Sequence, residues 1–169
     1  ENVMAASAMA IAYGVPMDVI LDTVKAFKGV EHRIEFVAEK GGVAYYNDSK
    51  GTNPDAAIKG IQAMNRPTVL IGGGYDKDSS YEECIRSFDG RVKCLVLLGQ
   101  TRDKIAKAAR ACGFEQILMA DTFEEAFRRS VQQAAPGDAV LLSPACASWD
   151  MFPSYEVRGR VFKDLVHEL

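Results

Sequence analysis

Apolar residues follow two patterns along this chain, and the second part of the chain shows the simpler one. In that part, short and mainly apolar runs at 68–71, 94–98, 117–119 and 139–142 alternate with amphipathic stretches. Such runs are typical of parallel strands buried on both faces, and the stretches between them are typical of covering helices. We therefore expect helices at 55–64, 79–88, about 101–112 and 122–133, and a last one from about residue 155.

The first part of the chain predicts two helices and a hairpin. An alanine- and methionine-rich stretch ends near Gly14, and an amphipathic stretch at 16–27 ends at Lys28-Gly29. Two short strands, 34–39 and 43–47, are joined by a glycine pair and predict a β-hairpin. The whole pattern predicts a Rossmann-like α/β fold, with a mostly parallel six-stranded sheet, helices on both faces and an N-terminal hairpin strand.

Composition narrows the class of protein. The chain has 169 residues, 48% hydrophobic and 25% charged, which suits one globular α/β domain. A net charge of -3 and the lack of a basic cluster argue against nucleic-acid binding. No apolar run reaches the length of a membrane span, so we expect no membrane contact. The four cysteines show no C-x-x-C pairing, which favours buried thiols in a reducing compartment over a zinc site or disulfides.

The loop between the second strand and the following helix is the first candidate site. Asn53 is the expected N-cap and Pro54 the expected first helical residue. A helix N-terminus presents free N–H groups and a partial positive charge, which suit an anion, and Lys50 adds a full positive charge. Asp48 and Thr52 add acceptors and a hydroxyl. An ordinary, well-capped strand–helix loop remains the alternative.

Two more strand ends carry unusual residues. Segments 72–78 and 143–150 follow apolar strands, and ligands bind at the carboxyl ends of strands in such sheets. The first contains three glycines and Lys77 but fits neither nucleotide-binding glycine motif, and a flexible turn is the alternative. The second contains Ser148 and a cysteine, but His32 and His167 stand in no nucleophile context. We expect these loops to meet at one edge and to position a ligand.

At these residues the chain resembles the C-terminal part of the Mur ligase family, and within it the member that adds D-glutamate. The resemblance spans nearly the whole chain and is carried by His32-Arg33, by Asn47 to Asn53, by Gly72-Gly73 with Lys77, and by Leu142 to Ser148 continuing through Asp150, Phe152, Arg158-Gly159 and Phe162. The opening Glu1 to Ala6 resembles the end of a helix from the family's central domain. Trp149 and Tyr155 depart from the family's usual residues at these positions.

The resemblance implies an ATP-dependent, amide-forming ligase of the bacterial cytoplasm. Its substrates would be D-glutamate and UDP-N-acetylmuramoyl-L-alanine, joined through an acyl phosphate in peptidoglycan precursor synthesis. Residues 1–30 would form the end of the central ATP-binding domain and linker helices, and 31–169 would form the C-terminal amino-acid-binding domain. ATP and Mg²⁺ would bind mainly in the central domain, so we expect this chain to be inactive alone.

The resemblance also implies roles for individual residues. The expected catalytic residues are Lys50 and Arg33. The expected D-glutamate site is Lys50, Thr52, Lys77, Ser148, Trp149 and Tyr155, and the expected ATP contacts are Asn2, His32, Arg33 and Asp48, with no metal ligands. Two alternative hypotheses are another Mur-type or folylpolyglutamate ligase, and a free-standing Rossmann-like module that binds a nucleotide or anion.

Overall fold

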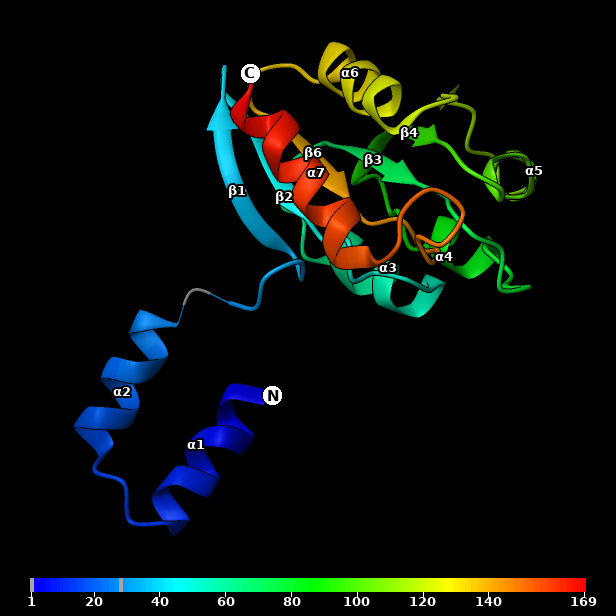
Figure 1. Ribbon diagram of the computed structural model, residues 1–169. Helices are drawn as coiled ribbons and strands as arrows, with labels where there is room; N and C mark the ends of the chain where they lie inside the picture. The colour runs from blue at the N-terminus through cyan, green and yellow to red at the C-terminus, as the bar shows by residue number, and fades with distance from the viewer. Residues whose placement is uncertain (1, 28) are drawn as a thin grey trace. The chain divides into compact units, whose positions relative to one another are not determined.

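The computed structural model describes residues 2–27 and 29–169, which divide into two compact units, Glu1–Val30 and Glu31–Leu169. The first unit consists of two helices, α1 (Asn2–Ala12) and α2 (Met17–Ala26), as the helical pattern predicts (Figure 1). Pro16 is the N-cap of α2 rather than its first residue. The expected helix end at Lys28 lies outside the described residues.

The second unit is built on a six-stranded sheet with the order β1-β2-β6-β3-β4-β5. Its strands are β1 (Glu35–Lys40), β2 (Val43–Asn47), β3 (Thr68–Gly72), β4 (Val92–Leu97), β5 (Ile117–Met119) and β6 (Ala139–Leu142). Strand β1 pairs antiparallel with β2, and every other pairing is parallel. The expected hairpin and mostly parallel sheet are therefore confirmed.

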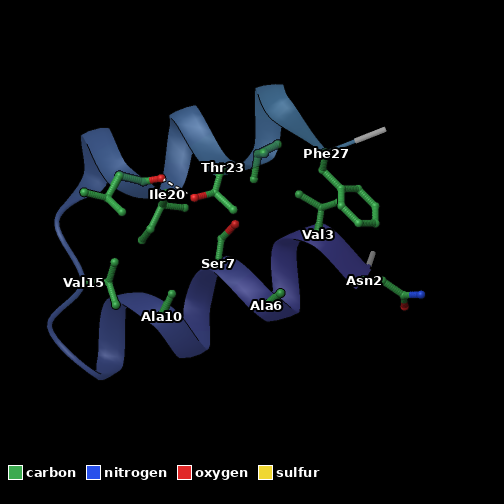
Figure 2. A pocket seen from close by; sticks show the side chains of 11 residues that line it. Asn2, Val3, Ala6, Ser7, Ala10, Val15, Ile20, Thr23 and Phe27 are labelled. Carbon is green, nitrogen blue, oxygen red and sulfur yellow. Dashed lines mark hydrogen bonds between the residues drawn. The ribbon is translucent and has the colours of Figure 1, made fainter. Parts of the chain in front are cut away.

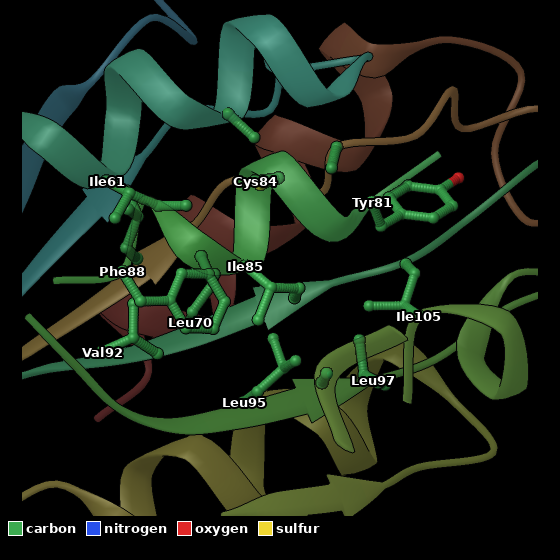
Figure 3. Close-up of a cluster of buried hydrophobic side chains, with 14 of the residues drawn as sticks. Ile61, Leu70, Tyr81, Cys84, Ile85, Phe88, Val92, Leu95, Leu97 and Ile105 are labelled. Atoms are coloured by element: carbon green, nitrogen blue, oxygen red, sulfur yellow. The ribbon is translucent and has the colours of Figure 1, made fainter. Parts of the chain in front are cut away.

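Helices cover both faces of the sheet, as predicted (Figure 1). One face carries α3 (Pro54–Gln62), α4 (Glu82–Arg86) and α5 (Arg102–Ala111), and the other carries α6 (Phe123–Gln133) and α7 (Tyr155–His167). Leu70 of β3 packs with Ile61 and Ile85 (Figure 3), while its neighbours on the strand face the opposite cluster. This alternation buries β3 on both sides, and each fully buried aliphatic side chain stabilises the fold by about 1.5–3 kcal/mol. None of the described helices is long and apolar enough to cross a membrane.

The starts of two helices follow the predicted capping. The Asn53 side chain accepts a hydrogen bond from the Ala56 N–H at 2.9 Å, with Pro54 as the first residue of α3. Thr122 accepts from the Glu125 N–H at 3.1 Å and caps α6. Each cap satisfies an otherwise unpaired N–H and is worth about 1 kcal/mol.

The helix expected at 79–88 is shorter than predicted, since α4 spans Glu82–Arg86 alone. Its N-cap residue, Tyr81, makes no side-chain capping bond, and Asp78 before it has a φ of 59°. The segment leading to α4 is instead held by backbone contacts to another loop, described below. Strand β4 begins at Val92, two residues before the predicted start, because its pairing with β3 already begins at Thr68.

Candidate functional site

Three strands end side by side where the sheet changes its winding direction. Strand β6 lies between β2 and β3, although the chain reaches it last. The helices that follow β2, β3 and β4 cover one face, and α6, which precedes β6, covers the other. Such a reversal leaves a crevice at the carboxyl ends of the strands, which is the usual ligand site of these sheets.

Backbone hydrogen bonds join the loops that leave these strands. They run from the Asp48 N–H to the Leu142 carbonyl (2.8 Å), from the Gly73 N–H to the Pro144 carbonyl (2.8 Å), and from the Tyr75 N–H to the Ala147 carbonyl (2.9 Å). We call the paired segments 73–75 and 144–147 the seam. Gly74 in the seam has a φ of 146°, and a β-carbon there would collide with the Ala147 carbonyl. The three predicted loops therefore meet at one edge and are tightly packed.

Arg158 of α7 forms hydrogen bonds to two of these loops. The family resemblance includes this residue but implies no role for it. Its side chain is 1% exposed. Its Nε donates to the Ser49 hydroxyl at 3.0 Å, and its Nη2 donates to the carbonyls of Ser49 (2.9 Å) and Cys146 (3.1 Å). Burial lowers the pKa of Arg158 to about 10, which leaves it protonated at neutral pH. The only sequence signal was the Arg158-Gly159 pair in the matching motif.

Asp48 is a buried carboxylate whose two oxygens are both hydrogen-bonded within the domain. Oδ1 accepts from the Ile34 N–H at 3.2 Å, and Oδ2 accepts from the Ser143 hydroxyl at 2.7 Å. Burial is the main cause that raises the pKa of Asp48 to about 6, against the opposing effect of these bonds. Asp48 thus connects the β6 loop to the turn before β1.

That turn, residues 32–34, presents Arg33 to solvent on a strained backbone. His32 and Ile34 have φ values of 64° and 48°, in the left-handed region that non-glycine residues rarely adopt. The His32 N–H donates to Glu35 at 3.0 Å, and its ring Nδ1 lies 2.9 Å from the Asn47 amide nitrogen. His32 is buried, whereas Arg33 is exposed. Backbone strain of this kind persists where surrounding contacts enforce it, and it is common at functional sites.

Lys50 and Tyr155 lie together at the mouth of the β2 loop. The Lys50 Nζ is 5.4 Å from the centre of the Tyr155 ring, a distance at which a cation is attracted to the ring face. The Ser49 hydroxyl donates to the Tyr155 carbonyl at 2.8 Å, which fixes the start of α7 against this loop. Thr52 follows, half-buried, with its N–H bonded to the Lys50 carbonyl at 2.8 Å.

The other expected substrate residues follow β3 and β6. Lys77 is exposed and makes no ion pair among the described residues, because Lys104 pairs with the acidic residues on either side of it. Trp149 is 64% exposed and packs against Tyr75, with ring centres 5.5 Å apart. The Ser148 hydroxyl is buried and has no hydrogen-bond partner among residues 2–27 and 29–169. Asn2 is an exposed residue at the start of α1, in the other unit.

One group of side chains has the spacing of a metal site. Ligand atoms of Glu31, His32 and Glu35 all lie within 4.8 Å of one another. The Lys163 ammonium donates to Glu31 at 2.7 Å and to Glu35 at 3.1 Å. Since this cation already neutralises the two carboxylates, we assign the group no metal.

The sequence matches known proteins along its whole length. A family described as Mur ligase, glutamate ligase domain, matches residues 32–146. A protein from Lachnospira eligens named UDP-N-acetylmuramoylalanine--D-glutamate ligase is 59% identical over 169 residues, and one of the same name from Thermoanaerobacter sp. is 57% identical over 171 residues. These matches cover all of this chain and 38% of each relative. The chain therefore spans less than half the length of the curated relatives it matches.

Solved structures share the fold at low sequence identity. The UDP-N-acetylmuramate-alanine ligase MurC from Thermotoga maritima superposes with a TM-score of 0.73 at 15% identity, covering 99% of this chain and 37% of that one. FolC from E. coli in complex with ADP superposes with a TM-score of 0.68 at 18% identity, covering 99% of this chain and 39% of that one. At such identities the likeness shows a common fold alone.

Proposed function

This chain belongs to the Mur ligase family, in its glutamate ligase domain, and we propose that it is the amino-acid-binding part of an ATP-dependent ligase that adds D-glutamate to UDP-N-acetylmuramoyl-L-alanine. The support is the identity of 59% over the whole chain to a relative of that name. The complete enzyme would act in the bacterial cytoplasm, in peptidoglycan precursor synthesis. Because the chain spans 38% of that relative, the activity belongs to a longer protein.

We assign the two compact units to different parts of that protein. Residues 31–169 form the amino-acid-binding domain, and residues 1–30 end the central ATP-binding domain. The second assignment is supported by an apolar groove of about 520 Å³ between α1 and α2 (Figure 2). It is lined by Val3, Ala6, Ala10, Val15, Val19, Ile20, Val24 and Phe27 among others. A helix pair with such a surface needs a covering partner, which the rest of a central domain would supply.

The D-glutamate site would consist of cations and hydroxyls at the strand ends. Two carboxylates on the amino acid require at least two positive charges, and Lys50 and Lys77 supply them from separate loops. Thr52 and Ser148 add hydroxyl donors. Trp149 and Tyr155 form the apolar wall against the methylene groups of the substrate. The single observation that carries this assignment is the buried Ser148 hydroxyl without a partner, at the edge where the three loops meet.

In the proposed reaction, ATP transfers its terminal phosphoryl group to the L-alanyl carboxylate, which gives an acyl phosphate and ADP. The deprotonated amine of D-glutamate attacks the acyl carbon, and the tetrahedral intermediate expels phosphate as the amide bond forms. The exposed guanidinium of Arg33 would follow negative charge on the phosphate, and Lys50 would hold the amino acid for attack. Mg²⁺ and ATP would bind mainly in the central domain.

The proposed nucleotide contacts in residues 31–169 are His32, Arg33 and Asp48. Of these, Arg33 is exposed, while His32 and Asp48 are buried: His32 lies in the strained turn and contacts Asn47, and Asp48 accepts from the Ile34 N–H of that turn. We therefore assign His32 and Asp48 the task of presenting Arg33. A ligase for another amino acid, or a free-standing anion-binding module, remains the rival, and the solved structures do not separate these because they share the fold alone.

A titration of the 169-residue chain tests the proposal. Backbone amide resonances are followed by NMR while D-glutamate, L-glutamate or inorganic phosphate is added. We expect D-glutamate to shift the amides of Thr52, Lys77 and Ser148 at millimolar concentration, and L-glutamate to shift them less. Equal shifts with phosphate would favour the anion-binding module, and shifts elsewhere in the chain would reject the proposed site.

A further inference from the structure

Two buried side-chain atoms among the described residues lack a hydrogen-bond partner: the hydroxyl of Ser148 and Nη1 of Arg158. Both belong to the region around the seam, since Arg158 bonds to the Cys146 carbonyl two residues before Ser148. Unpaired buried donors are rare in folded proteins, because each loses its hydrogen bonds to water without replacement. Their occurrence together makes this region a candidate site for a hydrogen-bond acceptor.

The direction of the free donor is well defined. The other two nitrogens of the Arg158 guanidinium are bound to Ser49 and Cys146, and the planar group then has a single orientation. Nη1 points toward Gly74, where a β-carbon would come within 3.4 Å of it. Because Gly74 has no side chain, Nη1 faces the backbone of the seam.

No carboxylate of the described residues contacts the charge of Arg158. It forms no ion pair within the described part of the chain, and the carboxylates of Asp48 and Asp150 act on it only from a distance. Asp48 accepts from Ile34 and Ser143, and Asp150 accepts from the Gln100 N–H at 3.0 Å. A buried cation without a counter-ion costs several kcal/mol. A carboxylate that arrives near the seam would recover part of this cost.

We propose that Arg158 is a positioning and specificity residue for the amino-acid substrate: its guanidinium holds the Ser49 and Cys146 loops at a fixed separation, and its unpaired charge favours a substrate carboxylate at Ser148. This inference rests on the proposed function. Arg158 is buried, so it acts by holding the loop that carries Ser148, through its bond to the Cys146 carbonyl, and through the electric field of its charge, which is strong in a poorly solvated region.

The test uses the complete ligase that contains this chain, with the substitutions Arg158→Lys and Arg158→Met. Lysine keeps the charge but lacks the planar fork whose Nε and Nη2 together bond to the two loops, and methionine removes charge and bonds. We expect the KM for D-glutamate to rise about tenfold in Arg158→Lys and about a hundredfold in Arg158→Met, with the KM for ATP and for the UDP-linked substrate within about twofold of wild type. Arg160→Met, an exposed arginine on the same helix, is the matched control and should change none of these values.

The outcomes separate the two proposals. If all three KM values and kcat change together, Arg158 is a structural residue and the inference fails, while the proposed function stands. If the wild-type enzyme does not use D-glutamate, the proposed function is wrong, and so is the inference that rests on it.

A measurement on the wild-type chain covers the case in which the variants do not fold. The side-chain Nε–H resonance of Arg158 is followed by NMR as D-glutamate is added. We expect it to shift together with the Ser148 amide, while that of Arg160 stays in place. A shift of the Ser148 amide without any shift at Arg158 would overturn the inference.

Discussion

Gly159 of α7 lies directly against the imidazole ring of His32. A β-carbon at this position would collide with the ring Nδ1 and would lie 2.9 Å from Cε1 and 3.1 Å from the Asn47 amide nitrogen. The strained turn that presents Arg33 is therefore locked by the helix that also carries Arg158. This contact joins the proposed nucleotide side of the site to its amino-acid side.

Gly159→Ala should destabilise the domain although it lies within a helix. Alanine in a helix normally gains about 1 kcal/mol over glycine. Here the added methyl group must displace His32, and we expect a net loss of about 1–3 kcal/mol, measured by urea unfolding. Arg160→Ala, at the next and exposed position, should stay within about 0.5 kcal/mol of wild type. A more stable Gly159→Ala variant would show that the ring moves at no cost.

Asp48 should make the domain less stable as the pH rises. Its pKa is raised, mainly by burial, from 3.8 to about 6 in the folded chain, so between these values the folded state binds more protons than the unfolded state. The free energy of unfolding then falls from about pH 4 to pH 6 and levels off above. Asp48→Asn should remove this slope. Between pH 4 and pH 7, the unfolding free energy of the wild type should therefore fall by at most about 3 kcal/mol relative to that of the variant. Urea unfolding across this range is the measurement, with the exposed Asp164→Asn as control; parallel curves for Asp48→Asn and wild type would contradict it.

Lys77→Met should impair substrate binding without affecting stability. The side chain is exposed and forms no ion pair in the described part of the chain, so its loss should change the unfolding free energy by less than about 0.5 kcal/mol. In the complete ligase we expect the KM for D-glutamate to rise about tenfold or more, because one of two carboxylate partners is lost. The exposed Lys107→Met on α5 is the matched control. An unchanged KM for D-glutamate in steady-state kinetics would show that Lys77 is not part of the site.

The four cysteines should differ sharply in reactivity. Cys84, Cys94 and Cys146 are buried, and burial raises the pKa of each thiol, to about 12 for Cys84. Cys112 is only partly buried. Because the thiolate is the reactive form, we expect a single fast phase with a thiol reagent at pH 8, abolished by Cys112→Ser. Mass spectrometry that finds Cys146 labelled first would contradict this order.

Much of the fold could be predicted because its signals are local. The buried strands such as 139–142 are unbroken apolar runs, and Asn53 and Thr122 cap their helices through bonds to residues three positions away. The helix predicted at 79–88 is shorter than expected for the opposite reason. Residues before it are held by contacts between the strand ends, which no local pattern reveals.

The candidate site, too, could be predicted from the sequence only in part. The motif residues and the expectation that their loops share one edge follow from sequence, because parallel strands place their carboxyl ends together. The burial of His32 and Asp48, and the central place of Arg158, do not follow, since Arg158 lies more than a hundred residues from Ser49, which it binds.

By itself, the sequence determined the family, most of the strands and helices, and the residue types available to the proposed site. Only the tertiary structure decided which buried polar groups have hydrogen-bond partners and which do not. Hydrogen-bond partners and burial depend on segments that meet through the sheet, and the free donors of Ser148 and Arg158 become visible only when every other partner is in place.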